Sequence, residues 1–322
     1  MLVSCASVPK HKHVFERKLS EGGLYYLDTC VECGYWDVYV DEGLASRCAP
    51  FFGLDENIRL IENPESIEDY ENNILYYALI GDYTPTLHFN SQMERTAFVK
   101  EMFNNHYFLS LRENHWCDRF DSLVGTYADL LAYAINQQHS YTTSDTADGY
   151  ELTIKLSNND HIHYPDGITS EKSFFRQQLV ALEQSKKMHD KFHETGRIND
   201  SMTDMEKLVV YVQALDRNAA RYRDKNMTEF GLLKHDGLFG MLNELDSNCV
   251  GTSANIAVFM RLEGMKAQMY SVEGHMIDRI LADGRIVLFD YYSNYRYYSS
   301  DAEYELLKHG GITYGLGTRL LF

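Results

Sequence analysis

The chain has 322 residues, 44% of them hydrophobic, and carries a formal net charge of −17 at pH 7. This length can bury one large core or two modest ones, and no run approaches the roughly 20 apolar residues of a membrane helix. The acidic balance argues against nucleic acid as a partner and against charge-driven binding to an anionic membrane, because no compact basic surface is available.

The N-terminus begins with the residues MLVSCAS. They resemble the end of a bacterial lipoprotein signal, in which Cys5 would carry a lipid anchor. Such a signal also needs a charged start and about 7–15 apolar residues. These are missing, so either the start codon is assigned too late or the match is chance. The bacterial cell envelope or a secreted location is favoured, and a cytoplasmic one stays open.

Residues 1–50 are predicted to form a hairpin with a metal site. The segment GLYYLDTCVECGYWDVYV indicates two strands, 24–28 and 35–40, with a CxxCG turn between them. Cys30 and Cys33 supply half of a tetrahedral zinc site, which His11 or His13 and Cys48 or Cys5 would complete. The preferred set is Cys30, Cys33, His13 and Cys48. Its zinc would be structural, because every position would be filled; two unliganded thiols or a redox pair is the alternative.

Residues 51–170 are predicted to form a mainly helical domain. Apolar residues recur near helical spacing in SIEDYENNILYYALIG and in DSLVGTYADLLAYAINQQ, whereas GYELTIKLS (149–157) alternates like a strand. Two further helices are expected in EKSFFRQQLVALEQSKKMHDKFHE and SMTDMEKLVVYVQALDRNAARY. The alternating charges of the first of these two helices are interpreted as a solvated face.

A cysteine stands at the start of a strongly apolar helix in LDSNCVGTSANIAVFMRLEG. Asp246, Ser247 and Asn248 are helix-capping residues, and Gly264 is a natural stop. The helix dipole and the unpaired amides of the first turn favour a thiolate at Cys249. A buried structural cysteine is the alternative interpretation.

A β-hairpin follows, with Asp283 and Gly284 as its two-residue turn between HMIDRILA and RIVLFDYY. In this register Ala282 lies opposite Arg285, so Ile277 lies opposite Asp290. Because side chains alternate, His275 and Asp290 are predicted to share one face of the sheet. Val287 and Phe289 are predicted to lie on the other face.

A cysteine at a helix start, with a histidine and an acid on one face of a neighbouring sheet, meets the requirements of a nucleophile, a base and an orienting carboxylate. The Cys-x-Gly that opens the helix, the Gly-x-x-Ala after it, the His leading one strand and the Asp closing the next resemble the transglutaminase-like superfamily over residues 202–298. This resemblance implies a papain-like α+β core, in which a buried Cys-bearing helix packs on an antiparallel sheet. The predicted domains are 1–50, 51–170 and 171–322, the last being catalytic.

The same resemblance implies the roles of the site residues. Cys249 would be the nucleophile, His275 the general base and acid, and Asp290 the residue that holds the imidazole. The chain departs from the common pattern at Ser247-Asn248, where many members have Gly-Val, and at Thr252, where an aromatic residue is common. It also departs at Met276-Ile277-Asp278, where an aromatic residue followed by Asn is usual. The resemblance assigns no oxyanion donor. The Cys249 amide is a general candidate, and Asn248, ahead of Asn243, is the chosen side-chain candidate.

The expected function is that of a cysteine enzyme acting on amide bonds of proteins or peptides through a thioester. Hydrolysis and acyl transfer, and thus peptidase, deamidase and cross-linking activities, all stay open. Catalysis would need no cofactor. The alternative is a catalytically inactive papain-like module that binds proteins.

Overall fold

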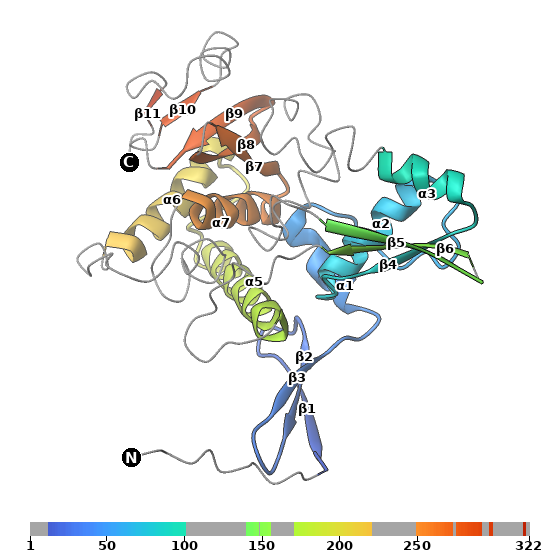
Figure 1. Ribbon diagram of the computed structural model, residues 1–322. Coiled ribbons are helices and arrows are strands. Elements are labelled where there is room, and N and C mark those ends of the chain that lie inside the picture. The colour runs from blue at the N-terminus through green and yellow to red at the C-terminus, as the bar shows by residue number, and fades with distance from the viewer. Residues whose placement is uncertain are drawn as a thin grey trace, which may run out of the picture.

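A computed structural model describes residues 12–100, 140–147, 149–155, 171–220, 249–272, 275–291, 296–298 and 318–319. Over these residues the chain is an α+β protein with three antiparallel sheets and six α-helices (Figure 1). This confirms the predicted fold class at the level of α+β. Among the described helices, none has both the length and the apolar character to cross a membrane.

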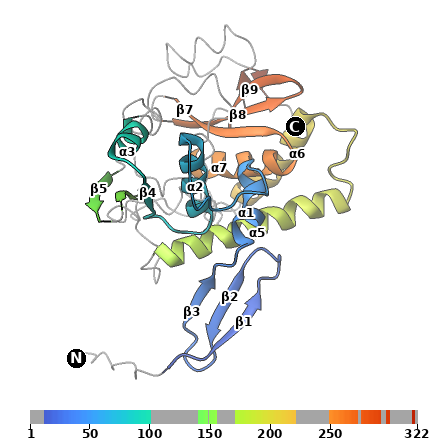
Figure 2. The ribbon, with the colours of Figure 1, turned by 90° about the vertical axis from the view of Figure 1, so that its right-hand side faces the viewer.

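The first sheet contains β1 (Phe15–Leu19), β2 (Tyr26–Cys30) and β3 (Trp36–Tyr39), in that order. It projects from the rest of the molecule (Figures 1 and 2), and all five residues of β1 are exposed. β2 and β3 correspond to the two predicted strands; β1 was not predicted. The connection between β1 and β2 contacts a long helix, α5 (Glu171–Glu194). Glu183 of α5 accepts hydrogen bonds from the amides of Gly22 and Leu24 at 3.1 and 3.2 Å.

The region after this sheet combines helices with a second sheet. It contains α1 (Leu44–Cys48), the 3-10 helix η1 (Ala49–Phe52), α2 (Ile67–Leu79) and α3 (Gln92–Val99), together with β4 (Thr86–Phe89), β5 (Ser140–Thr146) and β6 (Gly149–Lys155). The strand order is β4-β6-β5. The sequence predicted only the third of these strands. β5 was missed because its residues SYTTSDT lack apolar alternation, and β4 is only four residues long. The predicted helix within residues 121–138 lies outside the described residues.

Helix α2 illustrates how local sequence sets an element. The Ser66 side chain accepts a hydrogen bond from the Asp69 amide at 3.1 Å, and the Asp69 carboxylate accepts one from the Ser66 amide at 3.0 Å. This capping box starts the helix. Gly81 follows its end with φ of 79°, and a Cβ there would lie 2.5 Å from the ring of Phe175. Both the backbone conformation and the packing of α5 therefore require glycine at this position.

The third sheet has the order β11-β10-β9-β8-β7. Its strands are β7 (Lys266–Val272), β8 (His275–Ala282), β9 (Arg285–Asp290), β10 (Arg296–Tyr298) and β11 (Thr318–Arg319). Helices α6 (Asp204–Ala220) and α7 (Cys249–Leu262) pack with it in one hydrophobic cluster. Tyr291, just past β9, belongs to this cluster, and Tyr297 packs against it.

Helix α7 is the centre of the fold. Residues 251–261 are all buried, because α7 contributes Ile256 and Phe259 to the cluster with β7–β9 and Ala254 and Val258 to a second cluster. This second cluster joins residues of all three segments that the sequence predicted as domains. Its members include Leu44, Leu75, Leu179 and Val258. The predicted boundaries near residues 50 and 170 are thus crossed by one continuous core.

Candidate functional site

The β8–β9 hairpin has the register that the sequence predicted. Ala282 pairs with Arg285, Ile280 with Val287 and Asp278 with Phe289. Asp283 and Gly284 form the turn with φ of 50° and 72°, as a two-residue type I′ turn requires. The Asp283 carboxylate also accepts a hydrogen bond from the Asp204 amide at 2.9 Å, while Asp204 accepts one from the Asp283 amide at 2.8 Å. These reciprocal bonds tie the hairpin tip to the start of α6.

The three residues of the expected triad each stand at the end of an element. Cys249 is the first residue of α7, is half-buried and packs against the cluster that contains α2 and α5. His275 is the first residue of β8, opposite Val272 of β7. Asp290 is the last residue of β9 and is 1% exposed. Asn243, Asn248 and the side chain of His275 lie outside the described part of the structure.

The alternation of side chains divides the β8–β9 hairpin into two faces. Ile280, Val287 and Phe289 belong to the cluster that includes α6 and α7, so they lie on the helix-covered face. Val287 and Phe289 were predicted to lie opposite the face of Asp290, and their packing agrees. Continuing the register by one pair sets Asp290 opposite Ile277, on the face turned away from the body of α7. His275 has the same parity in β8 as Ile277.

Buried polar residues gather on the Asp290 face. Arg279 is 1% exposed and pairs across the strands with Gln268 and with Leu288. Asp290 lies two residues beyond Leu288, which makes it a diagonal neighbour of Arg279. Asp290 therefore lies near a buried guanidinium as well as in the strand position that the triad requires.

Asp278 is a buried acid. The sequence indicated it only as a departure from a family pattern and not as a candidate site residue. It has the parity of Ile280, so it lies on the helix-covered face. Burial raises the pKa of its carboxyl well above the usual range, and neighbouring Asp290 adds to this, while Ser253 and Arg261 act in the opposite direction. Burial likewise lowers the pKa of Arg261 to about 9. The sequence signal was an acid at a position of β8 where the alternation otherwise places apolar residues.

The structure brings three of the four predicted metal ligands together. Ligand atoms of His13, Cys30 and Cys33 lie within 4.8 Å of one another, and His13 Nδ1 is 3.4 Å from Cys33 Sγ. Ligands bound at about 2.0–2.3 Å to one zinc ion are separated by such distances. The Gly34 amide donates to the Cys30 carbonyl at 2.9 Å, with φ of 72° at Gly34. The glycine of CxxCG thus closes the turn that brings the two thiols together.

Cys48 is not in this group. It ends α1, is 2% exposed and packs in the core with Leu44 and Phe52. Burial raises the pKa of its thiol to about 12, which disfavours the thiolate that a metal ligand must supply. The packing of α1 places Cys48 in the core, and the spacing of the cysteines in the sequence did not reveal this. Cys5 and His11, the other ligands considered, lie outside the described residues.

A second group of potential ligands, His189, His193 and Glu263, was not predicted. The histidines stand four residues apart on α5, within the face that was interpreted as solvated. This spacing was the available signal. Glu263 is separated from them by about seventy residues of sequence, and no local pattern joins it to them.

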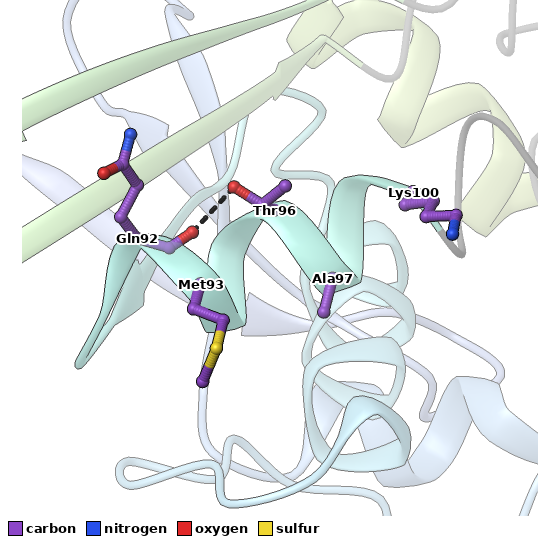
Figure 3. A pocket seen from close by; sticks show the side chains of 5 residues that line it. All are labelled: Gln92, Met93, Thr96, Ala97 and Lys100. Carbon is purple, nitrogen blue, oxygen red and sulfur yellow. Dashed lines mark hydrogen bonds between the residues drawn. The ribbon is translucent and has the colours of Figure 1, made fainter.

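A hollow on α3 offers little chemistry. It is lined by Gln92, Met93, Thr96 and Ala97 of α3 and by Lys100, the residue that follows this helix (Figure 3). The Thr96 hydroxyl donates to the Gln92 carbonyl within the helix at 2.7 Å. None of these five side chains is an acid, a thiol or an imidazole, and the functional candidates lie elsewhere.

Comparison with protein-family models, with curated proteins and with solved structures finds no match to this chain.

Proposed function

We propose that this chain is a transglutaminase-like cysteine enzyme that acts on amide bonds of proteins or peptides. The Cys249 thiolate attacks the amide carbonyl, and His275 as general acid gives a proton to the departing ammonia or amine, which leaves a thioester on Cys249. Water or a second amine then attacks the thioester, gives its proton to His275 and releases the thiolate. Asp290 orients the imidazole and stabilises its charged form.

The observation that carries this proposal is the register of the β8–β9 hairpin. With Ala282 opposite Arg285, positions 275 and 290 lie on the same face of the sheet, as a base and its orienting acid require. Cys249 begins a helix of 14 residues that packs against the same sheet. A thiol at a helix start is favoured as a thiolate by the helix dipole. Asn248 and the Cys249 amide are the proposed oxyanion donors.

A non-catalytic, protein-binding module is the second candidate. One observation that favours it is the position of Asp290 on the opposite face of the sheet from the residues that pack against α6 and α7. The other is the nearness of Arg279 to Asp290. In this alternative Asp290 is a structural partner of buried polar groups. Cys249 is then a packing residue at the edge of the core.

Thiol alkylation separates the two candidates. Iodoacetamide is applied at pH 6 to the full chain, and modification of each cysteine is followed by mass spectrometry, with Cys117 as internal control. The enzyme proposal expects Cys249 to react faster than Cys117, and this excess to disappear in His275→Ala. Equal rates at Cys249 and Cys117, or an unchanged excess in His275→Ala, support the binding module.

Turnover provides the second measurement. Incorporation of a fluorescent primary amine into casein and release of ammonia from glutamine peptides are followed for the wild type, Cys249→Ala and Asp290→Asn. Cys249→Ala is expected to abolish both reactions with an unchanged circular dichroism spectrum. Asp290→Asn is expected to slow them while Cys249 stays alkylatable. Turnover retained by Cys249→Ala contradicts the mechanism.

We also infer that the His13, Cys30 and Cys33 group binds a structural zinc ion. Two thiolates and one imidazole are a donor set that zinc prefers. Of the strands around it, β1 is exposed throughout and β2 and β3 are mostly half-buried, so a bound metal compensates for the small apolar core of this sheet. This zinc has no part in the acyl-transfer steps.

A further inference from the structure

Two histidines of α5 and one glutamate converge where α5 passes the end of α7. The Nε2 atom of His193 lies 2.9 Å and that of His189 lies 3.4 Å from the same oxygen, Oε1 of Glu263. The imidazole centroids are 4.5 Å apart, as expected for residues one helical turn apart. All three ligand atoms lie within 4.8 Å of one another.

Neighbouring side chains hold this group in a defined orientation. The Nδ1 atom of His189 lies 3.0 Å from Oδ1 of Asp190. A carboxylate on one ring nitrogen directs the other nitrogen, here Nε2, toward Glu263. Metal-binding histidines have this same arrangement, in which the second nitrogen donates to a carboxylate or a carbonyl.

Glu263 is anchored as a carboxylate. Its side chain is 2% exposed, and Tyr211 donates to Oε1 at 2.6 Å. Lys207 Nζ lies 3.3 Å from the other oxygen, Oε2. The two imidazoles thus contact Oε1, whereas the closest approach of the Lys207 ammonium group is to Oε2.

We propose that His189, His193 and Glu263 bind a divalent transition-metal ion of the Zn²⁺ class. Two imidazoles and a carboxylate suit Zn²⁺, Co²⁺ or Ni²⁺ rather than Ca²⁺ or Mg²⁺, which take mostly oxygen ligands. His189 and His193 are 20% and 34% exposed, so an ion can enter from solvent. Three protein ligands leave a further position for water. The ion would link α5 to the end of α7, independently of the proposed triad.

The alternative is a purely hydrogen-bonded cluster. In that case at least one imidazole donates Nε2–H to Glu263, and no ion is needed. The two arrangements differ in whether the group still binds a metal ion when the Cys33 site has been removed. A binding experiment decides between them.

The test uses the full chain, stripped of metal and titrated with Co²⁺. Cys33→Ser removes the thiolate site from consideration, and the remaining site is expected to bind one Co²⁺ without a sulfur-to-cobalt absorption band. Adding His193→Ala to Cys33→Ser is expected to abolish this binding. Adding His88→Ala is the matched control, because His88 on β4 is 73% exposed, and it should leave binding unchanged. Absence of Co²⁺ and Zn²⁺ binding in Cys33→Ser overturns the proposal.

Two further variants guard against misfolding as the cause of lost binding. Glu263→Gln, in the Cys33→Ser background, keeps the volume of the side chain and is expected to lose the site. Asp190→Asn leaves all three ligands in place and is expected to weaken Co²⁺ binding by about 10–100-fold. Equal binding in Cys33→Ser and its Glu263→Gln derivative overturns the assignment. So does a site that persists after His193→Ala. Neither result bears on alkylation of Cys249.

Discussion

The β1–β3 sheet and the β7–β9 strands are both antiparallel, but different interactions stabilise them. Every residue of β1 is exposed, whereas the last four residues of β9 are buried. The first sheet has an exposed ion pair, contacts with α5 at one end and the candidate ligand group of His13, Cys30 and Cys33. The other is covered by α6 and α7. Strand pairing alone therefore does not stabilise a sheet, and each has to obtain its stability from another source.

Metal removal should give the largest difference between the two sheets. Treatment with a chelator, or Cys33→Ser, is expected to abolish amide-exchange protection in β1–β3, because little apolar surface remains to order them. Protection in β7–β9 should be unchanged. The measurement is hydrogen exchange read by mass spectrometry, with metal content determined in parallel. Cys48→Ala is the control, since it alters the core but not the ligand group. Undiminished protection of β1–β3 after complete metal removal contradicts this view.

Truncation of an aromatic side chain should give the opposite result. Phe289→Ala is expected to lower the free energy of unfolding by about 3–5 kcal/mol, because it opens a cavity in a filled cluster. Phe15→Ala in β1 should lower it by less than about 1 kcal/mol, since the Phe15 side chain is 45% exposed. Urea unfolding followed by circular dichroism measures both. Equal losses for the two variants would show that β7–β9 is not the better-packed sheet.

The buried acid on the helix-covered face should make stability depend on pH. The folded-state pKa of Asp278 is raised, chiefly by burial, so between the unfolded value of about 3.9 and the folded value the native state binds the extra proton. Stability therefore falls as pH rises above about 4. Asp278→Asn is expected to reduce this fall and to stabilise the protein at pH 8 more than at pH 5.

Urea midpoints at the two pH values provide the measurement for Asp278→Asn. Asp200→Asn, at an exposed position, is the matched control and should leave the pH dependence as it is in the wild type. A pH dependence that is the same in Asp278→Asn and in the wild type would mean that Asp278 is ionised in the native state. Ser253 and Arg261 would then be the groups that stabilise its carboxylate.

An exposed ion pair in the first sheet should have the smallest effect. Arg17 contacts both carboxylate oxygens of Asp28 at 2.7 Å, and its guanidinium carbon lies 3.2 Å from the centroid of the Tyr39 ring. The hydrogen bond from Arg17 lowers the pKa of Asp28. Arg17→Met is expected to return this pKa toward its ordinary value, with little change in global stability, because water and salt screen exposed pairs. Carboxyl NMR titration measures the pKa. An Asp28 pKa that is the same in the wild type and in Arg17→Met would contradict the contact.

The elements that the sequence predicted well have a strong local signal. The Asp283-Gly284 turn and the alternation on either side of it predicted the register of β8 and β9 correctly, because positive φ values and side-chain parity follow directly from residue type. The helix start at Cys249 is local for the same reason. Polar strand β5 has no such pattern, so residues 51–170 were predicted to be more helical than the described part of them is.

The candidate sites show the same division. The CxxCG turn was recognisable because only Val31 and Glu32 separate its two cysteines and Gly34 closes the turn. Cys48 was chosen as a further ligand, but whether a distant cysteine points to that turn or into a core depends on the packing of α1. His189 and His193 have a visible spacing, but Glu263 joins them only because α5 passes the end of α7.

The sequence by itself determined the helix that begins at Cys249, the hairpin register and the turn that pairs Cys30 with Cys33, since each depends on backbone preferences within a few residues. Only the tertiary structure decided which face of the hairpin α7 covers, that Cys48 is a core residue and that Glu263 meets two histidines. These depend on how helices pack over long separations in sequence, where many apolar surfaces compete for the same core and side-chain pattern alone does not select among them.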